Sequence, residues 1–156
     1  MDHTKTDLLR GLAPEEADEA LALGTRITLG RGKELFHLGA DADWVYLIAR
    51  GRLQLTMPMQ VRGRQENIVV EERGPGETVG WSALIPPYRF TLTATAPLET
   101  EVIAFSREAL EHHFTAHPTT GFTISKNLAS VVGQRLQLFQ AMWLREMERM
   151  VELRCA

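Results

Sequence analysis

The segment GPGETVG, residues 74–80, places three glycines within seven positions and lies between stretches rich in β-branched and apolar residues. Glycine reaches positive φ and lets backbones approach closely, so this segment predicts a tight corner between strands. Short apolar or alternating runs separated by glycines continue on both sides of it. They cover residues 26–29, 44–48, 52–56, 67–70, 90–96 and 100–105, and Arg62-Gly63-Arg64 is predicted to be a hairpin tip. Many short strands with frequent turns predict a β-roll over residues 25–105.

Helical patterns flank this β region at both ends of the chain. Leucine and alanine spacing predicts an N-terminal helix over residues 5–24, with Gly24 as its stop. Ser106 is a suitable N-cap for a short helix over residues 106–117. A long helix of about 50 Å is predicted over residues 119–154. The sequence therefore predicts one domain, residues 1–156, that is mainly β with flanking helices.

The long helix carries an apolar stripe at spacings of three and four residues. A helix of this length extends past a small β-roll, so its far half needs another surface to cover it. The same helix of a second copy is the most economical cover, which predicts a homodimer. The stripe consists of Val132, Leu136, Phe139, Trp143, Met147 and Met150.

Composition and charge narrow the class of protein. Hydrophobic residues make up 44% of the 156 positions, which is typical of a globular chain, and the formal net charge is −3. That charge gives no electrostatic argument for nucleic acid. No signal peptide and no membrane-spanning run is visible, so no membrane association is expected. Cys155 is the single cysteine, which excludes an internal disulfide and favours the cytoplasm.

The glycine frame resembles the cyclic nucleotide-binding domain, the sensor domain of the catabolite activator and cyclic-AMP receptor superfamily. The segment GKELFHLG at residues 32–39 resembles the opening of that domain, and DADWVYLIARG at 41–51 the strand that follows. Residues 74–80 resemble the approach to its phosphate-binding cassette, and residues 94–105 its last strands. The resemblance implies a double-stranded β-helix, or jelly-roll, with a long C-terminal dimerisation helix. It also implies a ligand-sensing regulatory module that is not an enzyme.

The resemblance implies a ligand site, from which this sequence departs. In the family, amides at the cassette and an arginine bind a cyclic phosphate, and a glutamate binds the ribose. Here Trp81 stands where the glutamate is expected, and Phe90 stands where the arginine is expected. Phe139 and Gln140 replace two hydroxyl residues that contact adenine. Cyclic AMP is therefore expected to bind weakly or not at all, and the ligand is expected to be a nucleotide or another small anion.

The candidate ligand-binding residues lie in and around this cassette. They are Gly80, Trp81, Ser82, Ala83, Arg89, Phe90, Thr91 and Phe139. Two roles stay open at this stage. Arg89 either supplies the displaced guanidinium, if the loop before it is one residue shorter, or is a surface arginine. Trp81 either stacks on a ligand ring or fills the pocket itself.

Other classes of function remain as alternatives. The first is a structural or protein-interaction dimerisation module whose pocket has collapsed around Trp81 and Phe90. An enzyme of the cupin type needs several histidines and a carboxylate inside the barrel, and His37 is the single histidine of the strand region. No metal site is therefore expected, and haem ligation by His37 or His117 is the remaining cofactor alternative. Direct DNA binding is not expected, because no helix-turn-helix segment follows the long helix before Ala156.

Overall fold

The computed structural model describes residues 1–156, which form two facing four-stranded antiparallel sheets with helices at their ends. The strands are β1 (Thr25–Leu29), β2 (Glu34–Phe36), β3 (Trp44–Arg50), β4 (Leu53–Val61), β5 (Arg64–Arg73), β6 (Thr78–Val79), β7 (Thr93–Thr95) and β8 (Thr100–Ser106). One sheet has the order β1-β8-β3-β6 and the other the order β2-β7-β4-β5. This alternation of strands between two sheets is a jelly roll, so the predicted fold class is confirmed.

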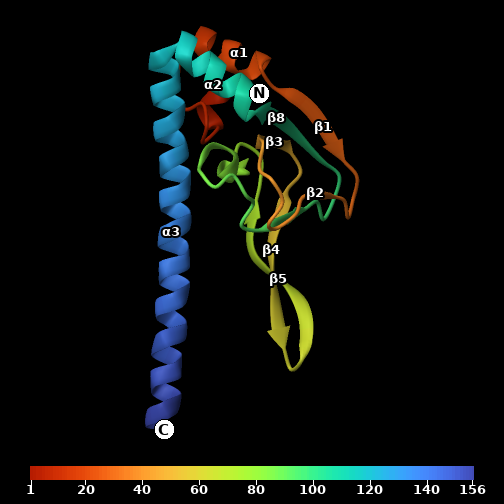
Figure 1. Ribbon diagram of the computed structural model, residues 1–156, viewed down its shortest axis with the longest axis vertical. Coiled ribbons are helices and arrows are strands. Elements are labelled where there is room, and N and C mark those ends of the chain that lie inside the picture. Colours follow the sequence, from red (N-terminus) through yellow and green to blue (C-terminus); the bar gives the residue numbers. More distant parts are fainter.

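The helical segments lie at one end of the roll and along its side (Figure 1). They are the 3-10 turn η1 (His3–Lys5), α1 (Pro14–Ala22), the 3-10 turn η2 (Trp81–Leu84), α2 (Arg107–Ala116) and α3 (Pro118–Cys155). The hydroxyl of Ser106 accepts a hydrogen bond of 3.1 Å from Ala109 N, as the predicted N-cap requires. Figure 1 shows α3 running down past the body of the roll and beyond the tip of the β4–β5 hairpin. No helix has an apolar stretch long enough to cross a membrane.

The core of the roll is built from the two central strands of the first sheet. Val45, Leu47 and Ile48 of β3 are fully buried, as are Val102 and Phe105 of β8. Alternate side chains of a strand point to opposite faces, so both faces of these strands are covered. One face packs inside the roll, and the N-terminal segment and helices join the same apolar cluster. This packing explains why β3 and β8 carry nearly continuous apolar runs.

The N-terminal helix is shorter than predicted. Residues 5–24 contain α1 alone as an α-helix, and the segment before it is a chain of turns. Gly11 has a φ of +87°, which ends any helix there. Asn127 Nδ2 of α3 donates to Leu8 O at 2.8 Å and to Arg10 O at 2.7 Å, so these carbonyls are bonded without a helix. The leucine pattern arises from tertiary burial, because Leu8 and Leu9 are both buried.

The predicted strand over residues 90–96 is also shorter, because its first residues pair outside the sheet. Phe90 N donates to Ala40 O at 3.1 Å, and Gly39 N donates to Phe90 O at 2.8 Å. Only Thr93–Thr95 forms the strand β7. The predicted hairpin tip is confirmed, since Arg62 and Gly63 join β4 to β5 with positive φ angles of 49° and 76°. The long helix matches its predicted range to within one residue at each end.

Candidate ligand site

The segment that resembles the phosphate-binding cassette turns sharply at Gly80. Its φ of +78° is left-handed, and a Cβ at this position would lie 3.0 Å from Trp44 O. The 3-10 turn η2 follows directly and buries Ser82 and Ala83, while Trp81 is half-buried. Glycine is therefore required here by both conformation and space. The turn points Trp81 toward the gap between the roll and α3, where it lines two cavities.

The inner cavity beside this turn is almost filled by the protein's own side chains. Its volume is about 10 Å³, close to the minimum that a single water molecule needs. The rings of Phe36 and Phe90 stack with centroids 3.9 Å apart, and the centroid of the Tyr46 ring lies 5.9 Å from that of Phe36. The cavity is lined by Phe36, Leu55, Gly80, Trp81, Ser82, Phe90, Thr91, Leu92 and Arg135. No nucleotide fits in this space without displacing these rings.

A second, larger hollow lies between the roll and α3. It has a volume of about 410 Å³ and an apolar wall, with Trp81, Thr91, Leu92 and Arg135 shared with the inner cavity. Met57 of β4 contributes from the roll, and α3 contributes the remaining side chains. Those are Val132, Leu136 and Phe139. Pockets of this size and character commonly hold small organic molecules.

The predicted site residues divide between these cavities, and two of them lie outside both. Gly80, Trp81, Ser82, Phe90 and Thr91 meet at the inner cavity. Phe139 meets Trp81 and Thr91 at the outer hollow. Ala83 is buried behind η2 and lines neither cavity.

Arg89 is turned away from the site toward the turn between β2 and β3. Its Nη1 donates to Gly39 O at 3.0 Å and lies 3.3 Å from Asp41 Oδ1. Its side chain is 60% exposed, and backbone pairing between residues 41 and 89 holds it there. The alternative of a shorter loop therefore does not describe this structure, in which Arg89 is a surface arginine.

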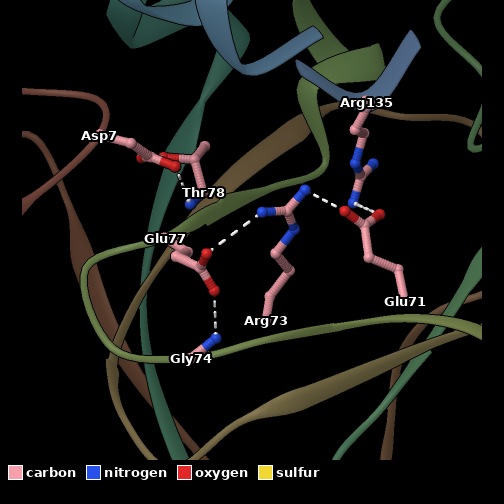
Figure 2. A network of polar contacts seen from close by, with 7 residues as sticks. All are labelled: Asp7, Glu71, Arg73, Gly74, Glu77, Thr78 and Arg135. Atoms are coloured by element: carbon pink, nitrogen blue, oxygen red, sulfur yellow. Dashed lines mark hydrogen bonds and ion pairs between the residues drawn. The ribbon is translucent and has the colours of Figure 1, made fainter. Parts of the chain in front are cut away.

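A buried charge network, which the sequence did not predict, borders the site (Figure 2). Arg135 of α3 is 6% exposed, and its Nη2 lies 2.9 Å from Glu71 Oε2 of β5. Glu71 also pairs with Arg73, whose Nη1 lies 3.1 Å from Glu77 Oε1. Glu77 accepts a 2.6 Å hydrogen bond from Gly74 N. Burial lowers the pKa of Arg135, and the charge of Glu71 opposes that effect. Two guanidinium groups and two carboxylates thus balance one another, and of these four groups only Arg135 lines the outer hollow.

Arg107 is a second residue that sequence reasoning missed. From the start of α2 its Nη1 donates to Ala42 O and to Ala83 O, both at 2.9 Å, and its Nη2 donates to Asp43 Oδ1 at 3.0 Å. Its guanidinium also lies over the Tyr88 ring, 4.0 Å from the centroid. These contacts hold η2 against the β3 side of the roll. An arginine in the first turn of a helix carries no sequence signal for such partners.

Breaking the ion pair between Arg135 of α3 and Glu71 of β5 should destabilise the fold. Glu71→Gln leaves the buried Arg135 opposite a neutral amide, while Arg73 keeps Glu77 as a partner, so we expect a loss of about 3 kcal/mol in the free energy of unfolding. Arg135→Met should cost less, because Arg73 still neutralises Glu71, and the double variant should cost less than the sum. Urea denaturation at one fixed protein concentration measures all three. Arg149→Met, an exposed charge on the same helix, is the control and should change stability by under about 0.5 kcal/mol. A Glu71→Gln loss no larger than that of the control would contradict the role assigned to the pair.

Comparisons with known proteins agree with this geometry. The family model of the cyclic nucleotide-binding domain matches residues 26–117. The cyclic AMP receptor protein of Thermus thermophilus is 31% identical over 130 residues, which are 83% of this chain and 57% of that protein. The chain therefore spans little more than half the length of that relative.

Solved structures show the same relationship. The crystal structure of the Thermus thermophilus catabolite activator protein superposes with a TM-score of 0.75 at 29% identity, covering 92% of this chain and 63% of the other. The N-terminal domain of a transcriptional regulator from Streptomyces coelicolor A3(2) superposes with a TM-score of 0.68 at 26% identity, covering 91% and 95%. The predicted resemblance is confirmed, and this chain belongs to the cyclic nucleotide-binding domain family of ligand-sensing regulatory modules.

Proposed function

We propose that this chain is a sensor module whose cassette does not bind cyclic AMP in the way usual for its family. One observation carries the proposal. The stacked rings of Phe36 and Phe90 leave about 10 Å³ where the resemblance places the cyclic phosphate and ribose. Trp81 and Phe90 replace the acid and the cation that the resemblance implies, and each lost charge-assisted contact is worth roughly 1.5–3 kcal/mol. Two such losses weaken binding by about two to four decades.

The charges around the site support the same conclusion. Arg89 already pairs with Asp41, and Arg135 already pairs with Glu71. The two arginines nearest the site therefore already have carboxylate partners, although the buried Nε and Nη2 of Arg135, which lines both cavities, make no hydrogen bond. The apolar wall of the outer hollow favours a ligand with an apolar or aromatic face, held between Trp81 and Phe139. We propose that such a ligand, rather than a cyclic nucleotide, is what the module senses.

A second candidate is an interaction module that has no small ligand. The aromatic stack favours it too, because buried rings stabilise a closed pocket without any ligand. The two candidates differ in the outer hollow, which the sensor fills with a ligand and the interaction module does not. Thermal melting across a panel of small apolar and aromatic compounds separates them, since a ligand at a hundred times its Kd adds about 2.7 kcal/mol.

We further propose that two copies pair through α3. Leu136, Trp143 and Met150 of the apolar stripe are 58%, 65% and 42% exposed, and they follow one another along the helix. Leu138, Met142 and Leu144 add further exposed apolar surface nearby. Burying one large apolar side chain is worth roughly 1.5–3 kcal/mol, so the stripe supplies the main driving force for pairing. The charged residues between these positions stay in water and contribute little.

The proposal about the cassette predicts how the chain responds to cyclic AMP. Calorimetric titration of the wild-type chain should give no saturable heat, whereas Trp81→Glu/Phe90→Arg, which restores the expected acid and cation, should bind cyclic AMP. Trp81→Gln/Phe90→Leu opens the same space without charge and is the matched control. Phe90 is buried, so a charged residue there can prevent folding. Each variant is therefore first tested for cooperative thermal unfolding. If the double variant does not fold, Trp81→Glu alone is titrated with cyclic AMP in its place. A micromolar or tighter Kd for the wild-type chain would refute the proposal.

The proposed pairing through α3 predicts the oligomeric state in solution. Light scattering should give a dimer of about 35 kDa, twice the 17.5 kDa of one chain. Phe139→Glu/Trp143→Glu places two charges in the stripe and should give a monomer. Gln137→Glu/Ala141→Glu places the same two charges at the same spacing on the opposite side of the helix and should stay dimeric. A wild-type monomer at micromolar concentration, or equal loss of the dimer in both variants, would rule out pairing through the stripe.

A further inference from the structure

Three metal-ligating side chains meet at the corner where α1, the end of α2 and the start of α3 come together. They are Glu19 of α1, His113 of α2 and His117 between α2 and α3. One ligand atom from each lies within 4.8 Å of the others. The sequence places His113 and His117 close together but gives no sign of Glu19, which the fold brings to them. This corner is far along the chain from the cassette and is independent of the proposed ligand site.

The hydrogen bonding of His117 fixes which of its nitrogens faces the glutamate. Its Nδ1 lies 3.3 Å from His113 O. A carbonyl oxygen only accepts, so Nδ1 carries the proton and donates. In the neutral ring Nε2 then presents its lone pair, and it lies 3.7 Å from Glu19 Oε2. A lone pair and a carboxylate oxygen repel one another unless a cation, either a proton or a metal ion, lies between them.

His113 supplies an independent observation. It is only 9% exposed, and its buried Nε2 has no hydrogen-bond partner. A buried polar atom without a partner is costly, and coordination to a metal ion removes that cost. Burial, together with the neighbouring His117, lowers the pKa of His113. The ring of His113 stacks on that of His117 with centroids 4.3 Å apart.

We propose that Glu19, His113 and His117 bind a divalent transition-metal ion, with Zn²⁺ as the best match. Two imidazoles and one carboxylate are a recognised zinc ligand set, in which a water molecule takes the fourth tetrahedral position. Ligand atoms about 2.0–2.1 Å from the metal lie about 3.3 Å apart, so the three groups must draw together by up to about 1.5 Å. Glu19 and His117 are exposed and can make this movement by rotating their side chains. The His117 ring must also turn out of its stack on His113, because two nearly parallel rings cannot both direct an in-plane lone pair at one ion. The bond from His117 Nδ1 to a carbonyl is the outer contact that orients metal-bound histidines.

The three ligands come from three separate segments, which gives the metal a structural consequence. It would tie α1 to the corner from which α3 leaves, and so stiffen the direction of the helix proposed to pair two copies. Metal binding should therefore raise the melting temperature, by about 5–10 °C at a hundredfold excess over Kd.

The test uses the full chain without an affinity tag, stripped with a chelator and titrated with Zn²⁺ by calorimetry and with Co²⁺ by visible absorption. We expect one equivalent of Zn²⁺ with a Kd below about 1 µM and a tetrahedral cobalt band. Glu19→Gln and His117→Gln should each weaken binding by at least about tenfold. Both side chains are exposed, so these variants should fold.

His112→Gln is the matched control, because His112 is the exposed neighbour of His113 and lines a different hollow with Asp43 and Trp44. It should bind Zn²⁺ like the wild type. Absence of stoichiometric binding would overturn the proposal. Equal weakening by His112→Gln, or no weakening by His117→Gln, would also overturn it, because either result indicates adventitious binding to surface histidines.

Discussion

Arg135 and Glu71 form an ion pair that is buried on both sides, 2.9 Å apart, at the contact between α3 and the roll. A buried charge is tolerated only when it is paired, so Arg135 must face β5. That requirement fixes the rotation of α3 about its own axis. Val132, Leu136 and Phe139 then line the outer hollow, and Trp143, one turn beyond Phe139, is 65% exposed. We infer that this one pair sets both the wall of the hollow and the direction of the apolar stripe.

The roll keeps the family's backbone, and we propose that the chemistry of its cassette has changed. Gly80 makes the left-handed turn at the cassette. Arg107 Nη1 donates a hydrogen bond to Ala83 O and so holds η2 in place. The side chains that enter the site are now Trp81 and Phe90, and the nearest guanidinium groups are occupied by Asp41 and Glu71. Fold and function are separable in this way because a backbone corner depends on glycines, whereas recognition depends on a few side chains.

The elements that sequence reasoning predicted are those with a local cause. The glycine-separated strands, the Ser106 cap and the long helix all follow from conformational preference and periodicity within a few residues. Long-range contacts decided the rest. The Leu8 and Leu9 segment looks helical, but Asn127 bonds its carbonyls from a distant helix. The Glu71–Arg135 pair and the approach of Glu19 to His117 have the same character, since no spacing rule links residues so far apart.

The central claim is that Trp81 and its aromatic neighbours occupy the space where relatives of this fold are expected to hold a cyclic nucleotide. Fluorine NMR of the chain labelled with 5-fluorotryptophan tests this directly, because the sequence has three tryptophans and Trp81→Phe assigns one resonance. On titration with a large excess of cyclic AMP, the Trp81 resonance should stay in place, as should those of Trp44 and Trp143. A saturable shift of the Trp81 resonance alone would show that the nucleotide enters the cassette, and would contradict the account.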